Sequence, residues 1–214
     1  MIFPLLSISI SLIITYLIGS IPFAYIYGKL FRNIDIRNFG SGNIGATNVL
    51  RILGKKAGII VLILDMLKGF LPVFIVKEIL QWNMEYAWLP VLIGIFAILG
   101  HTFTIFLLFK GGKGVATAAG VFLALTPIVL LIAFSFFIAV VALTKYVSLG
   151  SIFAALFVVT TNIFSYSSND PYVFYFSLIV AFFIIFKHKS NIIRLLKGTE
   201  NKINFNNKKN GDNK

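Results

Sequence analysis

Long apolar runs separated by short polar segments dominate the chain. The runs cover about residues 3–28, 57–76, 86–109, 115–143, 147–165 and 172–186. Most are close to 20 residues, the length at which a helix crosses a hydrocarbon core of roughly 30 Å. Thr126 and Pro127 interrupt the long fourth run near its middle, and proline breaks or kinks a helix. The pattern predicts an all-α integral membrane protein with seven transmembrane helices, one of them short, about residues 114–125.

Composition excludes a soluble fold, and charge orients the chain. Of the 214 residues, 58% are hydrophobic and 12% are charged, whereas charged residues make up about 25% of ordinary soluble domains. The net charge is +12, and 17 of the 19 Lys and Arg residues lie in segments that seven crossings place on one side. Since Lys and Arg of short loops stay in the cytoplasm, we expect the N-terminus outside and the C-terminus in the cytoplasm.

Composition also bounds the domains and the chemistry. Residues 1–200 are expected to form a single transmembrane domain, with residues 201–214 as a disordered cytoplasmic tail rich in Asn and Lys. The first ten residues carry no basic segment, so the first span is expected to be retained rather than cleaved as a signal. The absence of cysteine excludes disulfides, thiolate nucleophiles and Cys-based metal sites. With two histidines in the chain, no metal and no other cofactor is expected.

The first polar motif, GSGNIGATNVLR at residues 40–51, lies on the predicted cytoplasmic side. Its glycines let backbone N–H groups converge on an anion, and the start of the helix expected after Gly45 favours the same charge. Arg51 can bind phosphate oxygens with two N–H groups. The alternative is a flexible loop with helix-capping residues. The candidate phosphate-binding residues are Gly40, Ser41, Gly42, Asn43, Gly45, Thr47, Asn48 and Arg51.

Three further motifs lie on the same predicted side. KGGKGVAT at residues 110–117 again exposes glycine N–H groups beside Lys113, but it lacks the spacing and the strand of an ATP-binding P-loop. SLGS offers Ser148 and Ser151 for helix capping or for substrate contact. His188 and Asn191 share a face if the last span continues as a helix; the alternative is an ordinary basic flank. The candidates from the glycine motif are Gly111, Gly112, Lys113 and Gly114.

Two charges lie inside a predicted span. Asp65 and Lys68 are one helical turn apart, and an unpaired charge near the membrane centre costs at least about 2.5–3.5 kcal/mol. We therefore expect a mutual ion pair with a structural role, with a proton relay as the alternative. His101 is expected to pack or to form a hydrogen bond rather than to bind a ligand.

Acidic residues are scarce on the predicted cytoplasmic side, where Asp35, Glu200 and Asp212 are the only ones. No pair of carboxylates suggests general acid and base catalysis, and no aspartate follows either histidine at H-x₄-D spacing. Such a site suits substrates that carry their own negative charge and a good leaving group. Catalysis would then depend on positioning and on electrostatic stabilisation.

The motifs GSGNIGATNVLR, GHTFTIFLLFKGGKGVAT, SLGS and HKSNIIRLLKGTE, in this order and spacing, resemble those of the bacterial acyl-phosphate-dependent glycerol-3-phosphate acyltransferase family over residues 1–200. LDMLKG also looks like family sequence, whereas Thr104 stands where the family commonly has proline. The resemblance implies an acyltransferase of phospholipid biosynthesis in the bacterial cytoplasmic (inner) membrane, with its active site on the cytoplasmic side. It would transfer a fatty acyl group from acyl phosphate to the 1-hydroxyl of glycerol 3-phosphate, giving lysophosphatidate and inorganic phosphate.

The resemblance also assigns roles to individual residues. It makes Ser41 and Arg51 necessary for activity and phosphate contact, and Lys113 a phosphate ligand in a pocket that Gly111, Gly112 and Gly114 shape. It places His188 and Asn191 in the active site, lets Ser148 or Ser151 line the pocket, and makes Glu200 a structural acid.

The implied partners are acyl phosphate, glycerol 3-phosphate, the bilayer and the enzyme that supplies acyl phosphate; no nucleic acid is expected. We expect a single direct displacement without an acyl-enzyme. The departing phosphate or His188 accepts the proton, or His188 only orients the substrate. The alternative function is a membrane transporter or flippase for a phosphorylated anion, which predicts polar groups near the membrane midplane.

Overall fold

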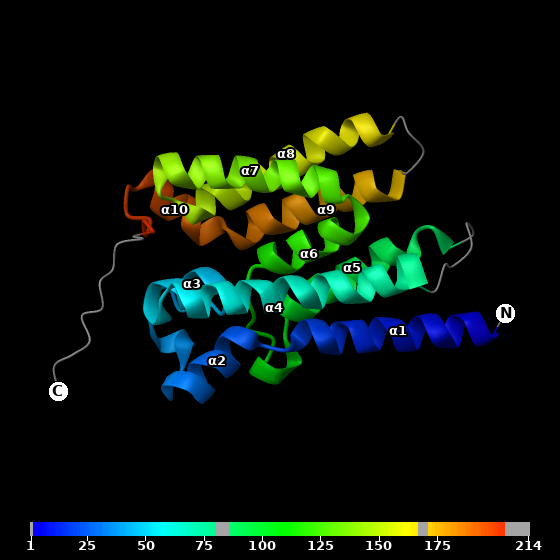
Figure 1. Cartoon of the computed structure of the whole chain (residues 1–214), viewed down its shortest axis with the longest axis horizontal. Helices are drawn as coiled ribbons and strands as arrows, with labels where there is room; N and C mark the ends of the chain where they lie inside the picture. Colours follow the sequence, from blue (N-terminus) through cyan, green and yellow to red (C-terminus); the bar gives the residue numbers. More distant parts are fainter. Residues whose placement is uncertain (1, 80–85, 167–170, 204–214) are drawn as a thin grey trace.

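The described part of the chain is a bundle of helices without strands (Figure 1). The computed structural model describes residues 2–79, 86–166 and 171–203. Its α-helices are α1 (Ile2–Ser20), α2 (Phe23–Arg32), α3 (Ala46–Leu53), α4 (Lys55–Phe74), α5 (Leu89–Thr102), α6 (Val115–Leu125), α7 (Pro127–Thr144), α8 (Val147–Tyr166), α9 (Pro171–Lys187) and α10 (Lys189–Leu196). Short 3₁₀ segments η1 (Ile36–Asn38) and η4 (Ile105–Leu107) and a π-helical turn η2 (Ile75–Ile79) complete it.

The apolar helices match the predicted spans. Three helical segments, Lys55–Glu78, Leu89–Leu107 and Pro127–Thr144, are long and apolar enough to cross a membrane. The bent pairs α1 with α2 and α9 with α10 raise this number to five when each pair counts as one span. The shorter apolar helices α6 and α8 complete the set of seven segments that the hydrophobic pattern predicts. The break between α6 and α7 falls at Thr126, as predicted from Pro127.

Two pairs of consecutive helices meet at a bend. The run at 3–28 divides at Ile21 and Pro22, where α1 ends and α2 begins at an angle of 40°. Pro22 has no N–H group to continue the hydrogen-bond ladder of α1. The last span also bends, by 58° between α9 and α10, so the condition that it continues as one straight helix through His188 is not met.

Glycines bring two helix pairs into backbone contact. A Cβ atom on Gly100 of α5 would collide with the carbonyl oxygen of Tyr16 in α1, and one on Gly120 of α6 would collide with that of Met66 in α4. Small residues at such crossings allow the close helix packing that stabilises bundles in membranes. Helix α6 therefore packs tightly on α4, and it also contacts α7 and α9.

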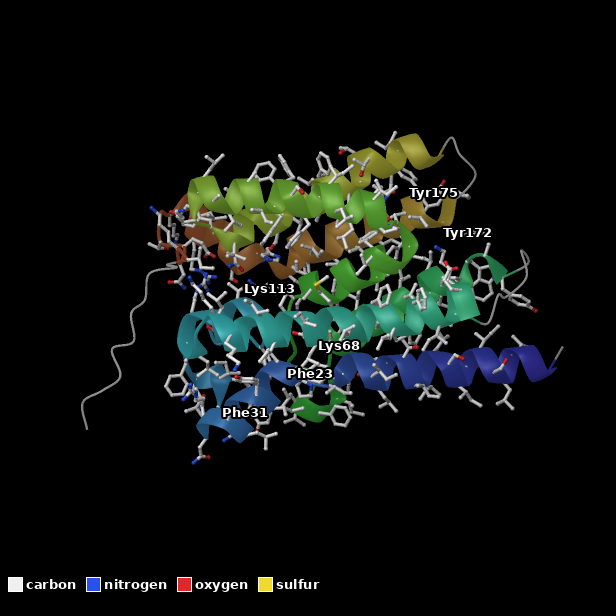
Figure 2. The ribbon with its side chains drawn as sticks, viewed as in Figure 1. Phe23, Phe31, Lys68, Lys113, Tyr172 and Tyr175 are labelled. Carbon is white, nitrogen blue, oxygen red and sulfur yellow. The ribbon has the colours of Figure 1, made fainter. Side chains whose placement is uncertain are left out.

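The shortness of α6 creates a recess. Its 11 residues span only about 16 Å at 1.5 Å per residue, so α6 begins deeper in the bundle than α3 or α10 (Figure 1). We call the end of the bundle that carries α3, α10 and the loop between α7 and α8 the site end; α1 begins at the opposite end (Figure 1). Lys113, just before α6, lies inside the bundle near the start of α6 (Figure 2).

The glycine contact at α6 yields a stability prediction. Gly120→Val should force α6 and α4 apart, and overpacking of this kind costs about 1–3 kcal/mol. We expect a lower melting temperature in detergent, measured by thermal unfolding. Leu143→Val, at a side chain that is 86% exposed, is the control and should melt like the wild type; equal melting of the two variants would contradict the close packing.

Candidate active site

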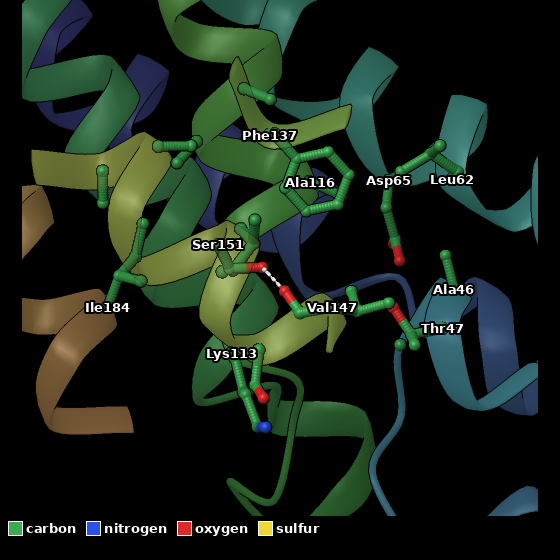
Figure 3. Close-up of a pocket in the computed structure, with 18 of the residues that line it drawn as sticks. Ala46, Thr47, Leu62, Asp65, Lys113, Ala116, Phe137, Val147, Ser151 and Ile184 are labelled. Carbon is green, nitrogen blue, oxygen red and sulfur yellow. Dashed lines mark hydrogen bonds between the residues drawn. The ribbon is translucent and has the colours of Figure 1, made fainter. Parts of the chain in front are cut away.

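A continuous cavity of about 750 Å³ begins at the site end and extends along α6 and α7. Its wall combines a polar end with a long apolar part (Figure 3). The polar side chains that line it are Ser41, Asn43, Thr47, Asn48, Asp65, Arg51, His101, Lys113, Ser148, Ser151, Ser177, His188, Asn191 and Glu200. The motifs predicted from four distant parts of the sequence therefore meet at one cavity.

Asn48 holds the first glycine motif against α3. Its buried side chain accepts a hydrogen bond from the N–H of Ser41 at 2.9 Å and donates to the carbonyl oxygens of Ile36 and Phe39 at 3.3 and 3.0 Å. Gly40 adopts a φ of +60° in this turn, a conformation that favours glycine. The amide of Asn48 is thus committed to the backbone, and it fixes the loop rather than pointing freely at a ligand.

The start of α3 forms part of the cavity wall. Gly45 is its N-cap, and Gly45, Ala46 and Thr47 line the cavity. The first N–H groups of a helix have no partner within the helix, so this end of α3 favours an anion. Gly40 and Gly42 shape the loop from outside the cavity wall.

Arg51 reaches the cavity from the last turn of α3. One terminal nitrogen, Nη2, donates to the carbonyl oxygen of Asn201 at 3.0 Å. Its Nε is buried and has no hydrogen-bond partner within the described part of the chain. A buried donor without a partner costs free energy, and a phosphate oxygen in the cavity would satisfy it.

The second glycine motif uses its N–H groups differently from the prediction. Gly111 donates to the carbonyl oxygen of Thr102 and Gly112 to that of His101, both at 3.1 Å. These two N–H groups are occupied inside the protein and do not face an anion. Gly112 and Gly111 fix the loop on the end of α5, and the loop in turn presents Lys113 to the cavity.

Glu200 connects the motifs at the polar end. Its Oε1 accepts hydrogen bonds from Ser148 Oγ at 2.8 Å and from Asn191 Nδ2 at 2.7 Å, and its Oε2 accepts from Arg194 Nε at 2.7 Å. Asn191 also accepts a hydrogen bond from Lys113 Nζ through its Oδ1. The carboxylate therefore joins α8, α10 and the lysine loop, a contact set that suits a structural acid.

Burial and neighbouring cations alter the protonation of this network. Burial lowers the pKa of Lys113 to about 8; the negative charge of Glu200 opposes this shift, and the positive charges of Arg194 and Arg51 add to it. Burial would raise the pKa of Glu200, but hydrogen bonds from Asn191, Arg194 and Ser148 outweigh it and lower that pKa. At neutral pH, Lys113 is cationic and Glu200 is anionic.

His188 lies at the bend between α9 and α10. Its Nδ1 is 2.8 Å from the carbonyl oxygen of Ile184, and a carbonyl oxygen only accepts hydrogen bonds. We therefore assign the proton to Nδ1, which leaves Nε2 of the neutral ring as an acceptor. Although the helix is bent, His188 and Asn191 both line the cavity.

A buried charge cluster lies deeper in the bundle. Lys68 Nζ is 2.8 Å from Asp65 Oδ1, and both side chains are 2% exposed, so the predicted mutual pair is present. His101 Nδ1 is 3.6 Å from the same oxygen. The histidine thus packs against the ion pair, as expected, although Asp65 and His101 also reach the cavity wall.

The apolar part of the cavity opens sideways. Ile59 of α4 and Leu131 and Ile138 of α7 line it and are also between 51 and 59% exposed on the outside of the bundle. The cavity therefore reaches the lipid-facing surface between α4 and α7, with α6 behind it. Phe137 of α7 faces its interior opposite α4 (Figure 3).

Some contributors to the site were not predicted. Arg194 belongs to the last motif, but the motif predicts no role for it, although it follows Asn191 by three residues and so shares its face of α10. The packed part of the chain continues through residues Asn201–Ile203, past the predicted boundary at residue 200. The carbonyl oxygen of Asn201 accepts a hydrogen bond from Arg51, and the N–H of Ile203 donates to the carbonyl oxygen of Lys145. The rest of the predicted tail, residues 204–214, lies outside the described residues.

Comparisons with known proteins agree with the geometry. The family model "Glycerol-3-phosphate acyltransferase" matches residues 9–198. A glycerol-3-phosphate acyltransferase of Fusobacterium nucleatum is 50% identical over 194 residues, which cover 91% of this chain and 97% of the relative. Glycerol-3-phosphate acyltransferase 2 of Bacillus anthracis is 48% identical, covering 91% and 98%. The crystal structure of PlsY (YgiH), an integral membrane glycerol 3-phosphate acyltransferase in its glycerol 3-phosphate form, matches with a TM-score of 0.85 at 39% identity, covering 92% of this chain and 96% of that one.

The helical bundle matches that of an integral membrane acyltransferase. The chain belongs to the glycerol-3-phosphate acyltransferase family, which confirms the resemblance found in its motifs. The transporter or flippase alternative is not supported, because the predicted polar motifs gather at one end of the bundle.

The bonds of Glu200 predict a pH-dependent stability. Glu200→Gln should melt at a lower temperature than the wild type at pH 7, because the cations around it lose their counter-charge. Folding lowers the pKa of Glu200 from its ordinary value of 4.5, so its contribution is present above that pH and is lost as pH falls through the folded value. Thermal unfolding at neutral and acidic pH should show the difference shrinking in acid.

Glu78→Gln serves as the matched control. Glu78 pairs with Lys77 and its side chain is 50% exposed, so the variant should melt like the wild type. A Glu200→Gln variant with wild-type stability at neutral pH would show that the carboxylate does not hold the site together.

Proposed function

We propose that the chain transfers a fatty acyl group from acyl phosphate to the 1-hydroxyl of glycerol 3-phosphate and releases lysophosphatidate and inorganic phosphate. The observation that carries this proposal is the cavity itself, which joins a cationic end to an apolar groove open towards lipid. One substrate is a small water-soluble phosphate and the other a phosphate with a long alkyl chain. A cavity with these two parts accommodates both.

Phosphate binding is proposed for the cations and donors of the polar end. The unpartnered Nε of Arg51, the ammonium of Lys113 and the N-terminus of α3 converge on the same space. Ser41, Asn43 and Thr47 supply further donors around it. Charge-assisted hydrogen bonds of this kind are about twice as strong as neutral ones, and they would neutralise phosphate charge during the transfer.

Acyl transfer is proposed to proceed by direct displacement. The 1-hydroxyl oxygen attacks the carbonyl carbon of acyl phosphate, the bond from that carbon to the phosphate oxygen breaks, and phosphate leaves with the hydroxyl proton. Nε2 of His188 would accept a hydrogen bond from the hydroxyl and orient it. Lys113 and Arg51 would stabilise the charge that develops on the leaving phosphate.

Neither Ser148 nor Ser151 is placed to form an acyl-enzyme. Ser151 Oγ donates to the Val147 carbonyl oxygen at 2.9 Å (Figure 3). Ser148 Oγ donates to Glu200, whose carboxylate already accepts from Asn191 and Arg194 and has a lowered pKa. Such a carboxylate is a weak base and does not activate a serine nucleophile.

The site end is proposed to face the cytoplasm of a bacterium. Of the 19 Lys and Arg residues, 17 belong to segments that the positive-inside rule places there. Glycerol 3-phosphate would enter from the water on that side, and acyl phosphate would enter from the bilayer between α4 and α7. An enzyme that makes acyl phosphate is the implied supplier of the second substrate.

The choice of acyl donor tests the reaction. Purified protein should form lysophosphatidate from glycerol 3-phosphate and acyl phosphate, but not from acyl-CoA or acyl-carrier protein, as measured by product mass.

Arg51→Ala should slow the reaction by about 10²–10³-fold, the typical loss for one charge-stabilising donor. Lys29→Ala, at a basic residue outside the cavity wall, is the control. Equal use of acyl-CoA, or a near-normal rate of Arg51→Ala, would refute the assignment.

The pKa of Lys113 predicts an alkaline limit of activity. Below about pH 8 the side chain is cationic, and above it the ammonium loses its proton and its attraction for phosphate. The value of kcat/KM, which reports the free enzyme, should therefore fall as pH rises through about 8. In Lys113→Arg the guanidinium stays charged, so the fall should move to higher pH even if the maximum rate is lower. An unchanged alkaline limit in that variant would contradict the role of Lys113.

A further inference from the structure

We propose that Asp65, Lys68 and His101, which we call the buried triad, position the Gly111–Gly112–Lys113 loop for phosphate binding. The inference rests on the proposed function of Lys113 and extends it to residues that lie in the transmembrane part of the bundle. His101 acts on the loop directly, and Asp65 and Lys68 act through His101.

The triad connects α4, α5 and the break between α1 and α2. Asp65 and Lys68 come from α4, and His101 comes from the last turn of α5. Lys68 Nζ also donates to the carbonyl oxygen of Ile21 at 2.9 Å, at the break between α1 and α2, and lies 5.6 Å from the ring centre of Phe23 (Figure 2). The break between α1 and α2 leaves the carbonyl oxygen of Ile21 available as an acceptor. The hydrogen bond from Lys68 fixes this break relative to α4.

His101 touches the loop through both its backbone and its ring. Its carbonyl oxygen accepts the N–H of Gly112 at 3.1 Å. A Cβ atom on Gly112 would collide with the ring nitrogen Nε2 of His101, and one on Gly111 would collide with the His101 carbonyl oxygen. The loop therefore lies directly on the imidazole, and the orientation of the ring determines the position of the residue that follows, Lys113.

Asp65 is the charged group that faces this ring, and in the proposal its charge orients the ring. Its Oδ1 lies 3.6 Å from His101 Nδ1 and 2.8 Å from Lys68 Nζ. The three residues are at most 7% exposed, and apolar side chains of similar volume would fill such a space at no greater cost. Charged groups differ from apolar ones in that they favour one relative orientation, so the ion pair and the imidazole are held in a defined geometry. Asp65 and His101 also line the same cavity as Lys113.

Four variants test the triad. His101→Ala and Gly112→Ala should each lower kcat/KM for glycerol 3-phosphate by about 10–100-fold, mainly through a higher KM, as expected when a supporting residue or the loop is displaced. Adding His101→Ala to Gly112→Ala removes the side chain with which the new Cβ collides, so the double variant should recover part of the loss. Asp65→Asn with Lys68→Met removes both charges together, leaves neither charge unpaired, and should also raise KM.

The pH profile separates positioning from mere folding. A displaced loop exposes Lys113 to water, so the alkaline limit of kcat/KM should move from about pH 8 towards the ordinary lysine value of 10.5 in His101→Ala and in the double charge variant. A smaller amount of folded enzyme would lower the rate without moving that limit.

The control is Asn162→Leu, because Asn162 is fully buried in α8 and neither amide atom has a hydrogen-bond partner in the described part of the chain. It should leave both KM and the alkaline limit unchanged.

The outcomes distinguish the two proposals. An inactive wild type would refute the proposed function. An active wild type, with triad variants that keep both its KM and its alkaline limit, would overturn the positioning role alone. Strictly additive losses in the His101→Ala and Gly112→Ala double variant would also overturn it, because independent sites add.

Discussion

The carboxylate of Glu200 is the interaction on which the polar end depends. It accepts hydrogen bonds from Ser148, Asn191 and Arg194. Asn191 in turn accepts a hydrogen bond from Lys113 and so connects the carboxylate to the lysine. A single carboxylate among several cations limits two opposite effects. Without it the cations would repel one another in a partly buried site. With more carboxylates the site would not attract a phosphate. Glu200 therefore organises the cations while leaving the cavity an excess of positive charge.

The depth of the cavity follows from the short helix α6. Because α6 stops short of the site end and is held against α4 by Gly120, the lysine loop lies in a recess rather than on the surface. The same helix lies behind the apolar groove between α4 and α7. Helix length and one glycine thus place the proposed phosphate ligand and the proposed alkyl-chain groove next to each other.

Sequence patterns predicted the helices well and the site in part. Spans follow from runs of apolar residues and the α6–α7 break from Pro127, which are local signals. The bend at His188, the contact of Arg51 with Asn201 and the hydrogen bonds of Gly111 and Gly112 depend on packing between segments distant in sequence. Motif spacing could indicate that Asn48 belongs to the site, but only the folded loop shows that its amide is occupied by Ser41 and two carbonyl groups.

The lateral opening between α4 and α7 has a kinetic consequence. A substrate that arrives through it is diluted by the other lipids of the membrane, not by the volume of water, so its effective concentration is a mole fraction in two dimensions. Saturation by the alkyl substrate should then follow the ratio of substrate to host lipid, or to detergent in a micelle. Saturation by glycerol 3-phosphate, the proposed water-soluble substrate, should follow its concentration in bulk water. The two saturation curves of the enzyme would then be expressed in different units.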